Sequence, residues 1–159
     1  MRKGKAIIGA NYGDEGKGLI TDYLASKNPH NSVVVRINGG AQAGHTVVTP
    51  AGARHVLSHF GAGAFMDVPS HLSRFFIVNP ILFMKEYEVL IAKGVKPRIT
   101  IDGEAILSTP LDMMINQVSE ILRGPRRHGS CGLGINETVH RCQFSSEFKT
   151  IASDLLNPE

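Results

Sequence analysis

The sequence lacks tryptophan and has few cysteines, and each scarcity excludes a class of protein. Cys131 and Cys142 are the only cysteines among 159 residues, too few for a disulfide framework or a cysteine-based zinc site. No apolar run approaches the ~20 residues of a membrane span. The apolar run near the N-terminus is too short for a signal peptide. We therefore expect a soluble cytoplasmic protein without a membrane partner.

Excess charge of one sign is also scarce. The chain has 17 Lys and Arg against 14 Asp and Glu, a formal net charge of +3. It has no dense basic stripe of the kind that binds nucleic acid, and Arg123, Arg126 and Arg127 form the only basic cluster. The remaining composition, with 42% hydrophobic residues, is typical of a globular domain that buries its own core. These properties favour a small anionic ligand over nucleic acid.

Strand and helix signals alternate along the chain, which predicts an α/β fold. Two helix starts are well marked, by Asn79-Pro80 and by Thr109-Pro110, and Gly94 suits a helix end. We expect one domain over 1–159 with a mainly parallel sheet flanked by helices, a P-loop-like nucleotide-binding architecture. The predicted strands cover 5–10, 32–37 and 96–102, with others inside 55–65 and 74–80; the predicted helices cover 16–27, 79–94 and 109–123, and 145–159 is weakly helical.

The first of three glycine-bearing loops, "GANYGDEGKG" (9–18), resembles a P-loop but lacks the hydroxyl residue after Lys17. Its glycines let backbone N–H groups approach a ligand, and the following helix adds its N-terminal dipole. A carboxylate among phosphates needs a metal between them, so Asp14 suits a Mg²⁺ ligand or a proton acceptor. The alternative is a tight strand-to-helix turn whose charges are solvated.

The other two loops are "NGGAQAGHTVV" (38–48) and "RRHGSCGLGIN" (126–136). Ligand-binding loops of parallel sheets lie at the carboxyl ends of strands, and two of the three loops directly follow a predicted strand. Taken alone, His45 suits a half-buried loop histidine that hydrogen-bonds locally. Cys131 suits a packing or ligand-contact residue, because no histidine–acid partner for a nucleophile is evident.

Taken together, these loops resemble the adenylosuccinate synthetase family. Residues 13–18 read Gly-Asp-Glu-Gly-Lys-Gly, as in the family's signature. Residues 39–48 resemble its Asn-Ala-Gly-His-Thr segment, with Gln42 in the Asn position. Residues 128–137 resemble its Gly-Thr-Thr-Gly loop, with Ser130 and Cys131 in place of the two threonines. The order and spacing agree along most of the chain.

The resemblance implies a ligase of purine biosynthesis that joins L-aspartate to inosine monophosphate (IMP), using GTP and Mg²⁺. A phosphoryl group is first placed on the purine 6-oxygen, and the aspartate amine then displaces it. The implied partners are a purine nucleoside monophosphate, a nucleoside triphosphate, L-aspartate and a second copy of the chain in a homodimer.

The resemblance also implies a role for individual residues. Asp14 would take the proton from purine N1 and bind Mg²⁺ together with the carbonyl of Gly44, and His45 would act as general acid. Arg141 would reach across a dimer, although a solvated surface position suits it equally. The implied nucleotide- and phosphate-binding residues are Gly13, Glu15, Gly16, Lys17, Gly18, Gln42, Ala43, Thr46, Ser130, Cys131 and Arg141.

The chain also departs from the family. Members are at least twice as long, and their guanine-recognition and aspartate-binding segments lie in the later half. We therefore expect the N-terminal part of a longer enzyme or, alternatively, a truncated nucleotide-binding module without catalysis. The substitutions at Leu19, Gln42, Ser130, Cys131 and Leu133 also admit a phage-type enzyme that joins deoxyguanosine monophosphate (dGMP) to aspartate with ATP or GTP. Because such phage enzymes replace the loop aspartate and Asp14 is retained, IMP is the favoured substrate. A generic P-loop GTPase switch does not suit the missing hydroxyl.

Overall fold

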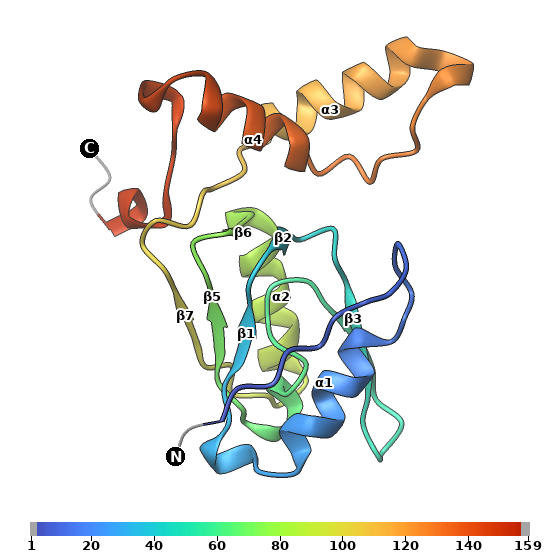
Figure 1. Ribbon diagram of the computed structural model, residues 1–159, viewed down its shortest axis with the longest axis vertical. Helices are drawn as coiled ribbons and strands as arrows, with labels where there is room; N and C mark the ends of the chain where they lie inside the picture. Colours follow the sequence, from blue (N-terminus) through green and yellow to red (C-terminus); the bar gives the residue numbers. More distant parts are fainter. Residues whose placement is uncertain (1–2, 157–159) are drawn as a thin grey trace.

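Three short parallel strands form the central sheet of the computed structural model, which describes residues 3–156. They are β1 (Val34–Arg36), β5 (Ser70–Leu72) and β7 (Ile99–Ile101), in the order β1-β5-β7. A second parallel pair, β2 (Gly39–Gly40) with β6 (Phe76–Ile77), lies beyond the carboxyl ends of β1 and β5 (Figure 1). The prediction of a mainly parallel α/β sheet is confirmed.

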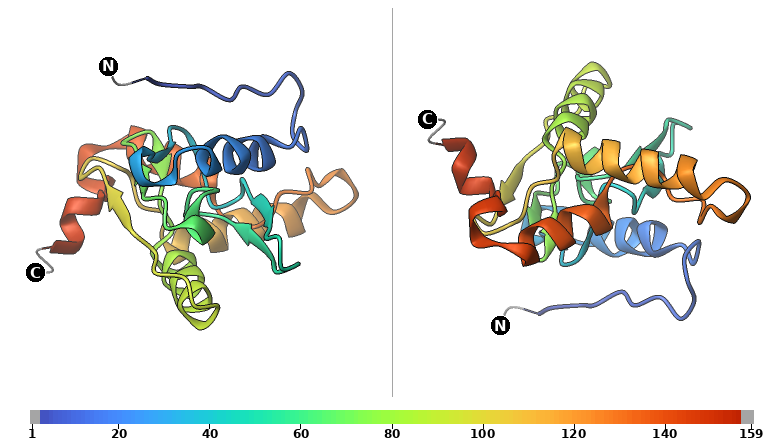
Figure 2. Two further views of the ribbon diagram at one scale, coloured as in Figure 1. Left: turned by 90° about the horizontal axis from the view of Figure 1, so that it is seen from below. Right: turned by 90° about the horizontal axis from the view of Figure 1, so that it is seen from above.

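Two helices lie on opposite sides of these strands, as Figure 2 shows: α1 (Lys17–Ser26) and α2 (Pro80–Ala92). The predicted signals of α2 are confirmed, because the Asn79 side chain accepts a hydrogen bond from the Leu82 amide at 2.9 Å. Gly94 beyond its end has a φ of 76°, a left-handed conformation that glycine adopts without a steric penalty. No helix within residues 3–156 is long and apolar enough to cross a bilayer.

The third and fourth helices, α3 (Pro110–Arg123) and α4 (Ile135–Phe144), pack together beyond the carboxyl ends of the strands (Figure 1). Thr109 begins α3 with a capping box formed with Asp112, as the Thr-Pro signal predicts. The sequence analysis missed α4. Its apolar positions are few, and its buried Thr138 contacts α3 through a polar bond to Asp112 at 3.1 Å, so hydrophobic periodicity does not reveal it.

An antiparallel hairpin carries the second glycine loop's histidine. It consists of β3 (His45–Val48) and β4 (Arg54–Leu57), with His45 opposite Leu57. The strand predicted inside 55–65 therefore ends at Leu57, and the one predicted inside 74–80 is only β6. Short 3₁₀ turns complete the described chain: η1 (Pro29–Asn31), η2 (Ala64–Met66), η3 (Gly124–Arg126), η4 (Ser146–Phe148) and η5 (Ala152–Leu156). The last two agree with the weak helical signal of the tail, of which residues 157–159 lie outside the described part.

The strand predicted over 5–10 is wrong. The described residues of this segment form no strand, and α1 lies between residues 3–9 and the parallel sheet (Figure 2). Ile8 is consequently 86% exposed. In the loop that follows, the Glu15 carboxylate accepts a hydrogen bond from the Asn11 amide at 2.8 Å, and this bond closes the turn before α1. An apolar run shows that a segment can pair with a sheet, but not that it does.

The core consists of two apolar clusters on either side of Ile99, which packs against both. One joins the hairpin to α2 through Val47, Leu57, Phe60 and Leu90. The other joins β5 and β6 to the segment before α3, through Leu72, Phe76, Val78, Ala105 and Leu107. Burial of this apolar surface fixes the hairpin and the strand ends on which the glycine loops are mounted.

Candidate functional site

The helices that begin at glycine loops differ from the other two in how they start. α1 follows Gly16 (φ 78°) and α4 follows Gly134 (φ 66°), and in the described residues neither has a side-chain cap. In contrast, Asn79 and Thr109 cap α2 and α3. The first-turn amides of α1 and α4 therefore remain free to bind an anion, as the N-terminus of a helix does in phosphate sites.

Glu15 is part of the first loop's own structure. Its carboxylate contacts the Lys17 ammonium and accepts a bond from the Asn11 amide at 2.8 Å. The Lys17 contact is the main cause that lowers the pKa of Glu15. A Cβ at Gly9 would lie 2.3 Å from Glu15 Oε1, so a side chain there would displace this carboxylate. One of the two carboxylates of the loop thus closes the loop around the lysine instead of facing a ligand.

Asp14, the second carboxylate, is available for a ligand. It is exposed, and its backbone has a φ of 54°, an uncommon conformation for a residue with a side chain. Within residues 3–156 its carboxylate accepts no hydrogen bond and joins no ion pair. This arrangement presents two carboxylate oxygens just before the free amides of α1.

His45 lies against the first turn of α1. A Cβ added at Gly18 would lie 2.8 Å from His45 Cβ, so the glycine allows the helix and β3 to meet this closely. Burial, followed by the charges of Arg36 and Lys17, lowers the pKa of His45 to about 4. The imidazole is therefore neutral at pH 7 and donates a single N–H.

Arg36 was not among the site residues predicted from the sequence. It holds the second loop in place through hydrogen bonds to backbone carbonyls. Its side chain, 5% exposed, donates to the carbonyl of Ala43 at 2.7 Å and to that of Leu57 at 3.3 Å. Burial lowers the pKa of Arg36 to about 10, so it keeps its charge at neutral pH. A lone arginine inside a predicted strand carries no signal of this role, since its partners are carbonyls distant in sequence.

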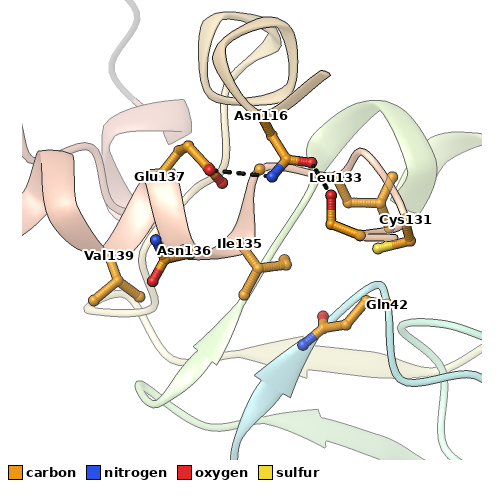
Figure 3. A pocket seen from close by; sticks show the side chains of 10 residues that line it. Gln42, Asn116, Cys131, Leu133, Ile135, Asn136, Glu137 and Val139 are labelled. Atoms are coloured by element: carbon orange, nitrogen blue, oxygen red, sulfur yellow. Dashed lines mark hydrogen bonds between the residues drawn. The ribbon is translucent and has the colours of Figure 1, made fainter. Parts of the chain in front are cut away.

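The second and third loops meet at a cavity of about 460 Å³ between β2 and α4 (Figure 3). A Cβ at Gly40 would lie 2.8 Å from Ile135 Cδ1, and this close approach brings the loops together. Three predicted site residues, Gln42, Ser130 and Cys131, line this cavity. The full lining is Gln42, Asn116, Ser130, Cys131, Leu133, Gly134, Ile135, Asn136, Glu137 and Val139.

A chain of polar groups runs along one wall of the cavity (Figure 3). Ser130 Oγ donates to Asn116 Oδ1 at 2.9 Å, and Asn116 Nδ2 donates to Glu137 Oε1 at 3.0 Å. Glu137 Oε2 is buried and has no partner in the described part of the chain. No Lys or Arg lines the cavity, so an anion bound there is stabilised by the backbone amides at the start of α4.

The structure gives Arg141 an internal role. It does not line the cavity, and its guanidinium makes two bonds of 2.9 Å to the buried carboxylate of Asp112. It also donates to the carbonyls of Leu107, at 2.8 Å, and Phe148, and to Thr150 Oγ1. These bonds and a side chain that is 17% exposed do not fit a solvated surface position. The reach across a dimer stays a prediction.

The donor set suits Mg²⁺ better than a metal held by protein alone. Within residues 3–156, no three His, Cys, Asp or Glu side chains gather to hold an ion. Mg²⁺ is commonly bound by one carboxylate with substrate phosphates and waters, and Asp14 is such a carboxylate. Of the other predicted residues, Thr46 lies exposed on β3, and Gly13, Gly16 and Gly18 lie with Asp14 in the first loop and at the start of α1.

The chain is similar to known proteins of one family. The family model of adenylosuccinate synthetase matches residues 6–157. The adenylosuccinate synthetase of Borrelia duttonii is 32% identical over 154 residues, which are 97% of this chain and 35% of that protein. The Mesoplasma florum enzyme is 37% identical over 134 residues, 83% of this chain and 30% of its own length. The chain spans about a third of the length of the curated relatives it matches.

Solved structures show the same fold. Fully ligated adenylosuccinate synthetase from Plasmodium falciparum matches with a TM-score of 0.77 and 26% identity, over 94% of this chain and 34% of that one. Succinoaminodeoxyadenylate synthetase of cyanophage S-2L, bound to dGMP and dATP, matches with a TM-score of 0.55 and 20% identity, over 84% of this chain and 41% of the other. The second likeness concerns the fold alone.

Proposed function

Because the chain belongs to the adenylosuccinate synthetase family, we propose that it supplies the purine-activating part of a purine nucleotide–aspartate ligase. The reaction joins IMP to L-aspartate at the expense of GTP. The observation that carries this proposal is the continuity of the three glycine loops. Gly18 of the first loop packs against His45 of the second, and Gly40 of the second packs against Ile135 at the end of the third.

Asp14 and His45 suit the first chemical step. The carboxylate of Asp14 takes the proton from N1, which makes the 6-oxygen an oxyanion able to attack the γ-phosphorus of GTP. The neutral imidazole of His45 donates its N–H to this oxygen or to the transferring phosphoryl group. Positioned proton transfer of this kind contributes ~10²–10⁴ in rate. Asp14 and the carbonyl of Gly44 would hold Mg²⁺, and that ion would neutralise charge on the phosphates.

The cavity suits the monophosphate of the purine nucleotide. Ser130, Cys131 and Gln42 offer polar side chains there, and the uncapped first turn of α4 offers amides. We assign the triphosphate to Lys17 and to the amides of Gly13, Gly16 and Gly18. To bind it, the Lys17 ammonium would leave the Glu15 carboxylate and contact a phosphate. Thr46 and Ala43 are assigned to the same group through the second loop.

An alternative substrate, dGMP, is favoured by one observation. Gln42, Ser130, Cys131 and Leu133 are the positions where the second and third loops depart from the familiar pattern, and all four line the same cavity. These four departures thus lie where a nucleotide would bind. The alternative enzyme would use either ATP or GTP as the phosphoryl donor. The retained Asp14 keeps IMP ahead. A third candidate is a nucleotide-binding module that does not turn over by itself, because the chain spans about a third of its relatives.

Calorimetric titration of the 159-residue chain with IMP and with dGMP tests the binding proposal. We expect one of the two to bind, with the Ser130 hydroxyl turning from Asn116 to the phosphate. Ser130→Ala is then expected to weaken that binding about tenfold through loss of one hydrogen bond to a charged group. Ser119→Ala on α3 is the control, because its hydroxyl makes no hydrogen bond in the described residues. Equal affinity in the wild type and Ser130→Ala contradicts the assignment of the cavity.

The catalytic proposal is tested in a chain extended to the length of the relatives. Asp14→Ala is expected to reduce purine- and aspartate-dependent phosphate release by at least about 10², with an unchanged circular dichroism spectrum. Glu88→Ala, an exposed carboxylate on α2, serves as control. Unchanged turnover in Asp14→Ala removes this residue from the mechanism. By the same resemblance we propose that the assembled enzyme is a cytoplasmic homodimer.

A further inference from the structure

The third glycine loop is held from its far side by a carboxylate that the proposed reaction does not use. Glu120, in the last turn of α3, has a side chain that is 13% exposed. Its Oε2 accepts hydrogen bonds from the amides of Gly129 at 2.7 Å and Ser130 at 3.2 Å, and its Oε1 accepts one from the amide of His128 at 3.3 Å. Three successive amides thus converge on one anion, as they do in anion-binding nests.

This carboxylate stays ionised under ordinary conditions. Burial alone would raise the pKa of Glu120, but the bond from Arg123 and those from the amides of Ser130, Gly129 and His128 outweigh it and lower the pKa to about 2. Arg123 Nη1 lies 2.6 Å from Glu120 Oε1 and balances the charge. The nest is therefore permanently occupied by a group of the protein itself.

The occupation decides which face of the loop is left for a ligand. The amides of residues 128–130 face α3, whereas the Ser130 and Cys131 side chains line the cavity. Asn116, one turn before Glu120 on α3, accepts from Ser130 Oγ at 2.9 Å, and Gln117 donates to the carbonyl of Gly132 at 3.1 Å. Left-handed glycines at 129, 132 and 134 give this loop many alternative conformations, and these contacts with α3 select one.

We propose that Glu120 is a positioning residue, an internal anion that fixes loop 128–132 so that Ser130 and Cys131 face the nucleotide cavity. The proposal rests on the proposed function, because the nucleotide is the ligand that the loop is positioned for. In this view the monophosphate binds to the cavity face and to the start of α4, and it does not displace Glu120 from the nest.

The test uses the 159-residue chain with Glu120→Ala and Glu120→Gln, and Glu88→Ala on α2 as the matched control. The first readout is amide hydrogen exchange at residues 128–130 without any nucleotide. We expect Glu120→Ala to accelerate this exchange about tenfold or more, because three bonds to a charged acceptor are lost. Glu120→Gln, which keeps one carbonyl oxygen, is expected to lie between, and Glu88→Ala to match the wild type.

The second readout is the affinity for IMP and dGMP by calorimetry. Glu120→Ala is expected to bind the preferred monophosphate about tenfold more weakly, with the same circular dichroism spectrum as Glu88→Ala. Added formate, a free carboxylate that fits the emptied nest, is expected to restore affinity in Glu120→Ala, whereas chloride at the same ionic strength is not. A general loss of folding does not respond to formate, so this rescue isolates the positioning role.

Two results overturn the proposal: tighter monophosphate binding in Glu120→Ala, which means that the carboxylate competes for the nest, or unchanged amide exchange at 128–130. A wild type that binds neither IMP nor dGMP refutes the proposed function instead. In that case the exchange experiment alone decides whether Glu120 positions the loop.

Discussion

At the scale of single residues, the site depends on how the loops use their charged groups. Glu15 and Glu120 both bind groups of their own chain. Glu15 contacts the Lys17 ammonium, and Glu120 accepts hydrogen bonds from the third loop's amides. Asp14 is left exposed and unengaged in the described residues. A sequence shows only that these carboxylates lie near glycines. Their hydrogen-bond partners show that Glu15 and Glu120 hold loops in place, whereas Asp14 is left for the proposed chemistry.

His45 provides a prediction at this scale. Because burial and the neighbouring positive charges lower its pKa to about 4 from 6.5, the unfolded chain binds a proton between these pH values and the folded chain does not. The stability that this histidine contributes is therefore complete above pH 6.5 and is lost as the pH falls toward 4.

We expect NMR titration of His45 to give a midpoint near 4. In urea denaturation, the free energy of unfolding of His45→Asn is expected to fall less than that of the wild type as the pH is lowered from neutral to about 4. His30→Asn, for which no such burial applies on its exposed 3₁₀ turn, is the control. A midpoint near 6.5 contradicts the buried position of the imidazole.

At the scale of elements, α3 and α4 form a polar pair that depends on one buried ion pair. Asp112 is 1% exposed and lies at the start of α3, where it closes the capping box, bonds Thr138 and receives two bonds from Arg141 of α4. The buried residues of both helices are polar, so α3 was predicted from its Thr-Pro start signal, and α4, which lacks such a signal, was missed.

Removal of Arg141 is therefore expected to be costly. Arg141→Met leaves the Asp112 carboxylate buried without its cation, and we expect the free energy of unfolding to fall by about 3 kcal/mol. The measurement is urea denaturation at neutral pH. Arg74→Met is the control, because its pair with Asp102 is exposed and such pairs contribute at most about 1 kcal/mol. Similar losses in the two variants would show that the Arg141 pair is not buried in solution.

At the scale of the whole molecule, the N-terminal segment lies apart from the sheet. Residues 3–9 run outside α1 (Figure 2), while the two clusters of the core involve the hairpin, β5, β6 and α2. The first loop thus enters the site from the outer side of α1, and the third loop enters it from beyond the strand ends. The site is assembled from parts of the chain that belong to different layers.

This arrangement predicts effects of very different size for two apolar substitutions. Ile8→Ser is expected to change the free energy of unfolding by less than about 0.5 kcal/mol, as is usual for an exposed position. Leu72→Ala, at a side chain with 0% exposure, is expected to cost about 3 kcal/mol. Urea denaturation of both variants checks this, and a large loss in Ile8→Ser would show that residues 5–10 do pair with the sheet.

The sequence by itself determined the α/β class, the starts of α2 and α3, and the glycine loops, because caps, apolar runs and glycine conformations act over a few residues. The strand over 5–10, helix α4 and the internal engagement of Arg141 were decided only by tertiary structure. Helix α4 and Arg141 depend on a contact between groups far apart in sequence, because Asp112 binds Arg141 across two helices. Residues 3–9 lie outside α1, away from the sheet that they were expected to join. Local patterns specify what a segment can form, and long-range burial and pairing select which of those possibilities is realised.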